Sequence, residues 1–272
     1  YVNDYNGNLV FAAPIASTTG SKMPVSLSLV YNGYQAGSNI NLPNAVGLGW
    51  RLNVQAKILI ISPTSNADDL NTKLYNAGYR FLYDDADGTT HYFKESSAGV
   101  YKDEDGLGLT ITQVTEEKPS YEKYKITSDD GTSLIFTSRG CLRKAFDTNG
   151  NYYEVKYKES STEDWKISKV IDGAGRVFTS GQITKISDPA GRNVSFTYSG
   201  NLLTKITYAD GTYTEFKYSG NYLSAVHSRN GGWIRYSYPT TGDSAAKSRI
   251  SKVEEYRNFF FGESRQKPAI KL

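Results

Sequence analysis

The feature of this sequence that most constrains its fold is a 20-residue period in the last third of the chain. A glycine, an aromatic residue and a tyrosine recur at this step, as Gly191, Gly211 and Gly231; Phe196, Phe216 and Tyr236; and Tyr198, Tyr218 and Tyr238. A repeat of this length is one β-hairpin, which is too small to bury its own apolar face. Successive copies must therefore pair edge to edge, and the period predicts a stack of hairpins in one sheet.

Asn-Gly and Asp-Gly dipeptides mark turns along the whole chain. They occur nine times, counted by their glycines: Gly7, Gly33, Gly88, Gly106, Gly131, Gly150, Gly173, Gly211 and Gly231. Such dipeptides favour a type I′ hairpin turn, whose two central residues need positive φ angles. A parallel sheet would need helical crossovers, and the spacing between these turns leaves no room for them. The sequence thus predicts an all-β fold of consecutive antiparallel hairpins that form a long curved sheet.

Two regions differ in regularity. Residues 126–272 carry the repeating hairpins, whereas residues 1–125 carry irregular hairpins and a Gly-Leu-Gly-Trp motif that ends at Trp50. The two regions could be continuous as one domain. In the first we expect strands over 6–18 and 23–34, a bend at 47–51 leading into an apolar strand up to residue 60, and an exposed connection over 62–76. After residue 253 the period breaks, and both a strand and a short helix stay open.

Charge and hydropathy limit the kinds of partner. The chain has 31 Lys and Arg against 28 Asp and Glu, a net charge of +3, and the two signs are interspersed. This balance does not indicate a nucleic-acid or anionic-membrane partner. The longest aliphatic run, Ile58 to Ile61, is far too short to cross a bilayer, so we expect no membrane insertion. The chain begins with Tyr1 rather than Met, and we expect it to be a piece of a longer protein.

Residues that could carry chemistry are few. His91 and His227 are the only histidines, and the sequence has no His or Cys pair at a metal-ligand spacing. We interpret Cys141, the single cysteine, as a small buried hydrophobic residue. The sequence has neither a Gly-x-Ser-x-Gly motif nor a phosphate-binding glycine loop. We therefore predict no catalytic residue, no cofactor and no metal site, and we do not expect an enzyme.

Two acidic stretches are the best candidates for a catalytic or metal site. They contain Asp84, Asp85 and Asp87, and Asp103, Glu104 and Asp105. Two carboxylates suffice for glycoside hydrolysis, and clustered carboxylates can bind calcium, although neither stretch has the spacing of an EF-hand loop. Aspartates also form turns by accepting hydrogen bonds from nearby amides, and we favour this interpretation.

The periodic tyrosines have two interpretations. In a strand, Tyr198, Tyr218 and Tyr238 lie on the same face as the aromatic residues two positions before them. Such rows of cross-strand aromatic pairs stabilise a sheet, and we favour this structural interpretation. The alternative is a sugar-binding surface that uses Tyr198, Tyr218 and Tyr238, because an exposed aromatic face of this size would be a large apolar patch.

The repeat units resemble the YD repeats of the Rhs family, which is related to teneurins and to the shell components of bacterial toxin complexes. The residues that match its repeat are Asp188, Gly191, Arg192, Phe196, Tyr198, Gly200, Leu203 and Ile206. The front of the chain, with Gly47-Leu48-Gly49-Trp50-Arg51, resembles the segment that introduces Rhs repeat regions. The stretch from Asp188 to Gly191 is similar to part of the family's self-cleavage signature, but Arg192, Asn193 and Val194 depart from it. We interpret it as an ordinary repeat turn.

The resemblance implies a β-strip that spirals into a hollow shell, which in polymorphic toxins encloses a C-terminal effector. With so few repeats this chain would form only an arc. The implied function is structural, in a secreted or cell-surface bacterial protein, and the implied partners are further repeats and an effector of the same polypeptide. The alternative is a glycan-binding or adhesion module, with carbohydrate as the partner.

Overall fold

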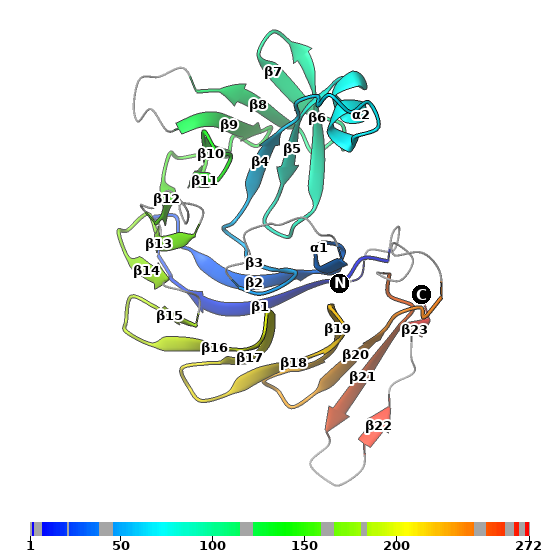
Figure 1. Ribbon diagram of the computed structural model, residues 1–272. Helices are drawn as coiled ribbons and strands as arrows, with labels where there is room; N and C mark the ends of the chain where they lie inside the picture. The colour runs from blue at the N-terminus through cyan, green and yellow to red at the C-terminus, as the bar shows by residue number, and fades with distance from the viewer. Residues whose placement is uncertain are drawn as a thin grey trace. The chain divides into compact units, whose positions relative to one another are not determined.

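The computed structural model describes residues 2, 7–20, 22–37, 46–114, 122–158, 166–180, 184–241, 249–258, 264–266 and 270–271 (Figure 1). Within these ranges the chain forms antiparallel strands and two short helices, α1 (Gly33–Gly37) and α2 (Leu70–Asn76). The predicted all-β fold of consecutive hairpins is confirmed. None of the helices in the described ranges is long and apolar enough to cross a membrane.

The chain divides into two compact units. The first contains residues 1–16, 27–52 and 179–272, and the second contains residues 17–26 and 53–178. The first unit thus combines strands from the start of the chain with the periodic hairpins from its end. The division at residue 125 describes the repeat content of the sequence and stays a prediction.

The first unit contains a three-stranded sheet and the periodic hairpins. The small sheet has the order β1 (Val10–Ser17), β2 (Ser26–Asn32), β3 (Trp50–Leu52). β14 (Val177–Ser180) precedes the remaining strands of this unit, of which β16 to β20 carry the period. These strands are β15 (Lys185–Ser187), β16 (Asn193–Ser199), β17 (Leu202–Thr207), β18 (Tyr213–Ser219), β19 (Tyr222–His227), β20 (Trp233–Ser237), β21 (Lys252–Asn258), β22 (Ser264–Gln266) and β23 (Ile270–Lys271). The region after residue 253, left open by the sequence, is therefore strand where the structure describes it.

The register of the periodic hairpins is the same in successive copies. Phe196 lies opposite Ile206, and Phe216 lies opposite Val226. In both hairpins the register shifts immediately before the tyrosine, between 197 and 198 and between 217 and 218. One hairpin for each 20-residue copy is what the sequence predicts.

The turns of these hairpins differ from the prediction. At the turn before β18, the amide of Tyr208 donates to the carbonyl of Thr212, and the amide of Gly211 donates to the carbonyl of Tyr208. Gly211 has φ of +82°, and among the described residues Met23 is the only non-glycine with positive φ. The predicted type I′ turn, with two positive φ angles, is therefore wrong. The turn has three residues, and its glycine alone takes the left-handed conformation.

The front of the chain departs from the sequence prediction at three places. Gly33 begins α1 instead of forming a hairpin turn, because the side-chain oxygen of Asn32 accepts the amides of Tyr34 and Gln35. The expected apolar strand up to residue 60 is interrupted after β3 by a turn at 53–54. The expected exposed connection over 62–76 contains α2, whose first turn is capped by the carboxylate of Asp69.

The second unit consists of hairpins without a strict period. Its strands are β4 (Lys57–Ile60), β5 (Tyr79–Asp84), β6 (Thr90–Ser97), β7 (Val100–Asp103), β8 (Leu109–Gln113), β9 (Glu122–Ser128), β10 (Ser133–Thr137), β11 (Leu142–Phe146), β12 (Tyr152–Tyr157) and β13 (Ile167–Ile171). From β4 to β13 each strand pairs with the next. The amide of Ile58 also donates to the carbonyl of Gly140 at 2.8 Å, so β4 meets the turn between β10 and β11.

Because β4 bonds to the turn between β10 and β11, the strands from β4 to β11 enclose an apolar core. The core residues come from β4 to β11 and the segment before β4: Ala56, Ile58, Phe81, Tyr83, Phe93, Ile111, Tyr124, Ile126, Phe136 and Leu142. Phe93, Ile111 and Phe136 have no exposed surface. Burial of these side chains supplies the main stabilisation of the second unit.

Candidate functional site

The Gly-Leu-Gly-Trp segment, residues 46–52, lies directly on the periodic hairpins of the first unit. The amide of Leu48 donates to the carbonyl of Asn201, in the turn between β16 and β17, at 2.9 Å. The indole Nε1 of Trp50 donates to the hydroxyl of Tyr218 at 2.9 Å, and that hydroxyl donates to the carbonyl of Leu203 at 2.6 Å. One of the two motifs that carry the family resemblance is thus bound to the other.

Aromatic packing surrounds this contact. The ring centroid of Trp50 lies 4.7 Å from that of Phe216 and 5.3 Å from that of Tyr31. Phe11 of β1 contacts both Trp50 and Phe216 edge to face. Trp50 is 2% exposed, and an aromatic cluster of this kind buries a large apolar area. The sequence predicts a structural role for Trp50 and Phe216 but does not predict the participation of Phe11 and Tyr31.

The hydroxyls of the periodic tyrosines are used inside the fold. Tyr218 donates to the carbonyl of Leu203, and Tyr238 donates to that of Leu223 at 2.7 Å; each carbonyl lies 15 residues earlier. The hydroxyl of Tyr31 accepts the amide of Leu223 at 3.0 Å. Burial raises the pKa of Tyr218 and of Tyr238 well above the usual range of tyrosine.

The same bond is present in the second unit. Tyr157 donates to the carbonyl of Leu142, again 15 residues earlier, at 2.7 Å. The role of Tyr157 was not predicted, although the sequence contains the signal. Tyr157 ends a loose copy of the repeat, and Leu142 stands at the same distance before it as Leu203 before Tyr218.

The predicted repeat residues lie in the turns and the core. Gly191, Gly211 and Gly231 have φ of +80°, +82° and +83°. Phe196 and Phe216 are buried, and the side chains of Tyr198, Tyr218 and Tyr238 are half-buried. These placements agree with the structural interpretation of the tyrosine face. Carbohydrate as a partner has no support, and the sugar-binding role of Tyr198, Tyr218 and Tyr238 stays an untested prediction.

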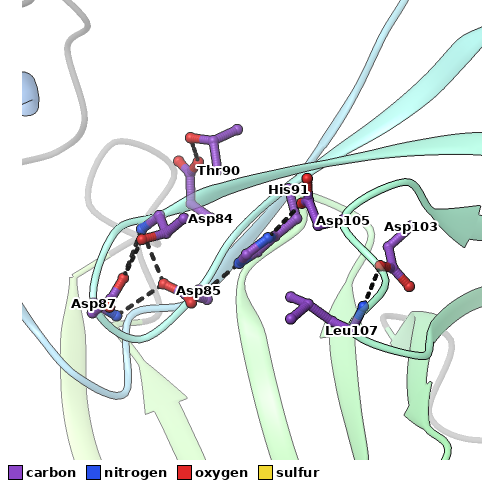
Figure 2. Close-up of polar contacts among 9 residues, drawn as sticks. Asp84, Asp85, Asp87, Thr90, His91, Asp103, Asp105 and Leu107 are labelled. Carbon is purple, nitrogen blue, oxygen red and sulfur yellow. Dashed lines mark hydrogen bonds and ion pairs between the residues drawn. The ribbon is translucent and has the colours of Figure 1, made fainter. Parts of the chain in front are cut away.

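A second cluster joins the two acidic stretches in the second unit, around His91 of β6 (Figure 2). The Nδ1 atom of His91 lies 2.8 Å from Oδ2 of Asp105, and its Nε2 atom lies 3.2 Å from Oδ2 of Asp85. Asp85 lies in the turn between β5 and β6, and Asp105 lies in the turn between β7 and β8. All three residues are candidates in the sequence, but their types and spacing do not predict that the histidine stands between the two aspartates.

The neighbouring carboxylates cap turns, as the sequence predicts. One oxygen of Asp85 accepts the amides of Asp87 and Thr89 at 3.0 Å each. The carboxylate of Asp103 accepts the amides of Leu107 and Leu109 at 2.7 Å each. Across the described ranges, no group of three or more His, Cys, Asp or Glu side chains is arranged to hold a metal ion. The arrangement can hold turns together and can bind a proton at His91.

The turn at Asp188 has the geometry of an ordinary repeat turn. One oxygen of Asp188 accepts the amides of Ala190 and Arg192, and the other accepts Nε of Arg192 at 2.6 Å. Asp172 makes the same bonds to Ala174 and Arg176. The resemblance to a cleavage signature at Asp188 is thus accounted for by a motif that occurs twice. Cys141, predicted to be buried, is only half-buried, and its burial raises the pKa of its thiol.

The comparisons with known proteins agree with the repeat assignment. The family model of the RHS repeat matches residues 179–213. No curated protein matches the chain. Among solved structures, the chain is similar to the Photorhabdus luminescens Tc holotoxin pore, with a TM-score of 0.42, 10% identity, and coverage of 98% of this chain and 16% of that chain.

Two further similar structures are the crystal structures of TcdB2-TccC3-Cdc42 and TcdB2-TccC3. Each has a TM-score of 0.41 at 10% identity, over 98% of this chain and 16% of that chain. At these TM-scores the likeness carries no inference about a role, and this chain spans about a sixth of the length of the proteins it matches. The assignment therefore comes from the family model and the repeat residues: the chain carries the Rhs repeat that its sequence predicts, over residues 179–213.

Proposed function

We propose that this chain is a structural segment of a secreted or surface-displayed bacterial Rhs/YD-repeat protein. In this proposal it forms part of the wall of a β-shell that encloses or presents a C-terminal effector of the same polypeptide. The observation that carries the proposal is the buried contact between Trp50 of the Gly-Leu-Gly-Trp segment and Tyr218 of the periodic hairpins. Such a contact fixes the start of a repeating strip, which is what a wall segment requires.

The use of polar groups within the fold supports a structural rather than a catalytic role. The hydroxyls of Tyr218 and Tyr238 donate to backbone carbonyls of the preceding copy of the repeat. The carboxylates of Asp103 and Asp188 bind amides of their own turns. Groups bound in this way stabilise hairpins. A tyrosine hydroxyl that donates its O–H to a carbonyl has no donor left for a sugar.

The test uses the longer polypeptide in which this segment stands. Limited proteolysis would follow the downstream effector in the native protein and in Trp50→Ala. We expect the effector to be protected in the native protein and cleaved faster in Trp50→Ala. Tyr34→Ala is the matched control, because Tyr34 is an aromatic residue of the same unit that is 63% exposed. An effector that is cleaved equally fast in the native protein and as an isolated domain would contradict the proposal.

A separate experiment tests the proposed absence of catalysis. The chain would be assayed against a panel of glycoside, peptide and ester substrates, with Asp85→Asn and Asp105→Asn as variants. We expect no turnover above that of buffer. Turnover that is abolished by one of these substitutions, in a variant that remains folded, would show an enzyme and overturn a purely structural role.

A further inference from the structure

His91 connects two hairpin turns that are separated by β6 and β7. Asp85 approaches one ring nitrogen from the turn between β5 and β6, and Asp105 approaches the other from the turn between β7 and β8 (Figure 2). The side chain of His91 is only 9% exposed. The imidazole is therefore held between two carboxylates with little access to water.

The number of N–H groups on the imidazole decides whether both contacts are attractive. A neutral imidazole carries one N–H, and its other nitrogen is an acceptor. In that state one of Asp85 and Asp105 would face a lone pair, which repels a carboxylate. A protonated imidazole donates from both nitrogens and carries a charge opposite to that of both partners. The two contacts, at 2.8 and 3.2 Å, together fit the protonated form.

The other charged and titratable groups on the surrounding elements have partners of their own. Asp84 accepts the hydroxyl of Thr90 at 2.6 Å, and Lys57 of β4 stands opposite Asp84 in the strand register. Asp87 accepts the hydroxyl of Thr89 at 2.6 Å. Glu104 pairs with Lys94 at 2.6 Å and accepts the hydroxyl of Tyr79. Asp103 caps Leu107 and Leu109, and Tyr83 of β5 lies against His91 through its ring, at a centroid distance of 5.9 Å.

The turn between β7 and β8 is stable in itself but is joined to its neighbour at few points. Asp103 closes the turn through two short bonds to amides at 2.7 Å. Towards β6, the amide of Glu104 donates to the carbonyl of Tyr92 at 3.1 Å, its carboxylate pairs with Lys94 at 2.6 Å, and Asp105 binds His91. Loss of the bond to His91 would therefore leave Glu104 to hold the turn to β6, through its amide and its ion pair with Lys94, and the attachment would be weakened.

We infer that His91 is a proton-dependent latch that holds the β7–β8 turn against the β5–β6 turn and releases it at alkaline pH. The ligand of this site is a proton. The inference does not depend on the structural role proposed for the whole chain. The element with two states is the β7–β8 turn. Its Asp105 is bound to His91 when the imidazole is charged and released when the imidazole is neutral.

The direction of the pH dependence follows from the environment of the ring. Burial lowers the pKa of His91, but the hydrogen bonds and charges of Asp85 and Asp105 outweigh burial and raise the pKa from 6.5 to about 8. A group whose folded pKa is raised contributes stability that is complete below its unfolded pKa. That stability is lost as pH rises through the folded pKa. The latch is therefore closed at neutral pH and opens as the pH passes about 8.

Nuclear magnetic resonance of the whole chain tests the latch. The His91 ring signal would be titrated, and the amide exchange protection of Glu104, corrected for the intrinsic pH dependence of exchange, would be compared at pH 6.5 and 9.5. We expect a midpoint near pH 8 and a loss of protection of at least about tenfold at the higher pH. Asp105→Asn should lower the midpoint to about pH 7, because one of the two charges that favour imidazolium is removed.

The variants separate the latch from general loosening at high pH. His91→Gln should have the same Glu104 protection at both pH values, because glutamine does not titrate, and His227→Gln should behave as the native protein. If His91→Gln does not fold, the midpoint of Asp105→Asn remains as the test. A native midpoint at pH 6.5 or below, or equal Glu104 protection at both pH values, would overturn the proposal.

Discussion

The periodic hairpins β16–β20 of the first unit and the hairpins β5–β11 of the second unit cover their apolar faces by different means. In the first unit, Phe216 is covered by residues from an earlier part of the chain, Trp50 and Phe11. In the second unit, the sheet returns on itself, because the amide of Ile58 in β4 binds the carbonyl of Gly140. Its core residues then face one another across the enclosed space.

The irregularity of the second unit explains why it can close. Its register shifts fall at different points along the strands, between 79 and 81, between 95 and 97 and between 135 and 136. Each such shift bends and twists the sheet locally. In the periodic hairpins the shift falls at the same place in each copy, before Tyr198 and before Tyr218. Hairpins with the same register shift each add the same bend and twist to the sheet. A strictly repeating sheet therefore needs another segment to cover its apolar face.

The largest expected effect is on the covering segment of the first unit. Trp50→Ala removes the ring that packs on Phe216 and should cost about 3–5 kcal/mol of the free energy of unfolding, as for other buried aromatic truncations. Urea denaturation with far-ultraviolet circular dichroism measures this cost. Tyr34→Ala, at a side chain that is 63% exposed, should change the free energy of unfolding by less than about 0.5 kcal/mol.

The Trp50 result distinguishes two ways in which the periodic hairpins could be stabilised. If the hairpins stabilise themselves by pairing alone, Trp50→Ala should cost no more than Tyr34→Ala, and the periodic hairpins would need no covering segment. If the covering segment is required, residues of β16–β19 should lose amide exchange protection while those of β5–β8 keep it.

The next effect concerns the closure of the second unit at Gly140. This residue has φ of +77°, and a Cβ added to it would lie 1.9 Å from the carbonyl oxygen of Ile58. Gly140→Ala must therefore separate β4 from the turn as well as strain the backbone, and it should cost roughly 3 kcal/mol. Urea denaturation is again the measurement.

A matched glycine isolates the contribution of the closure. Gly150 of the same unit has φ of +80°, and a Cβ added to it would meet no atom within 4 Å. Gly150→Ala should therefore cost only the strain of the left-handed conformation, about 1 kcal/mol. Equal costs for the two variants would mean that the contact between β4 and the 137–141 turn contributes nothing to stability.

The sequence predicts the hairpins well because their determinants are local. The glycine of each turn and the alternation of buried and more exposed residues at the start of β16 and of β18 can both be recognised within one copy of the repeat. The turn type was predicted wrongly because an Asp-Gly pair fits both a type I′ turn and the three-residue turn found at Gly211. The distinction depends on strand register, which the dipeptide does not fix.

The contacts between distant residues could not be predicted from the sequence. Trp50 and Tyr218 are 168 residues apart, and their contact depends on the position of the whole three-stranded sheet over the hairpins. His91, Asp85 and Asp105 lie closer in sequence, but they meet only because β6 and β7 pair with Phe93 opposite Asp103. Residue types and spacing identified both aspartates as turn formers; Asp85 does accept amides of its turn, whereas Asp105 binds His91. The histidine between them follows from the register alone.

The smallest expected effect concerns the tyrosine hydroxyl that donates to a carbonyl 15 residues earlier, which occurs in both units. Tyr157, Tyr218 and Tyr238 each donate to a carbonyl 15 residues earlier, but the hydroxyl of Tyr218 also accepts the indole N–H of Trp50. Tyr157→Phe and Tyr238→Phe should each cost about 1 kcal/mol, and Tyr218→Phe about 2 kcal/mol, because it breaks two hydrogen bonds. Denaturation of the three variants under identical conditions measures the difference.

A double-mutant cycle with Trp50→Phe then assigns that difference to the covering segment. Phenylalanine keeps an aromatic ring at position 50 but lacks the indole donor, so Tyr218→Phe should cost about 1 kcal/mol in that background, the same as Tyr157→Phe. An unchanged cost of Tyr218→Phe in the Trp50→Phe background would mean that its hydroxyl contributes only through its bond to the carbonyl of Leu203. In that case the periodic tyrosines would act identically in both units, and packing of the Trp50 ring alone would join the Gly-Leu-Gly-Trp segment to the repeats.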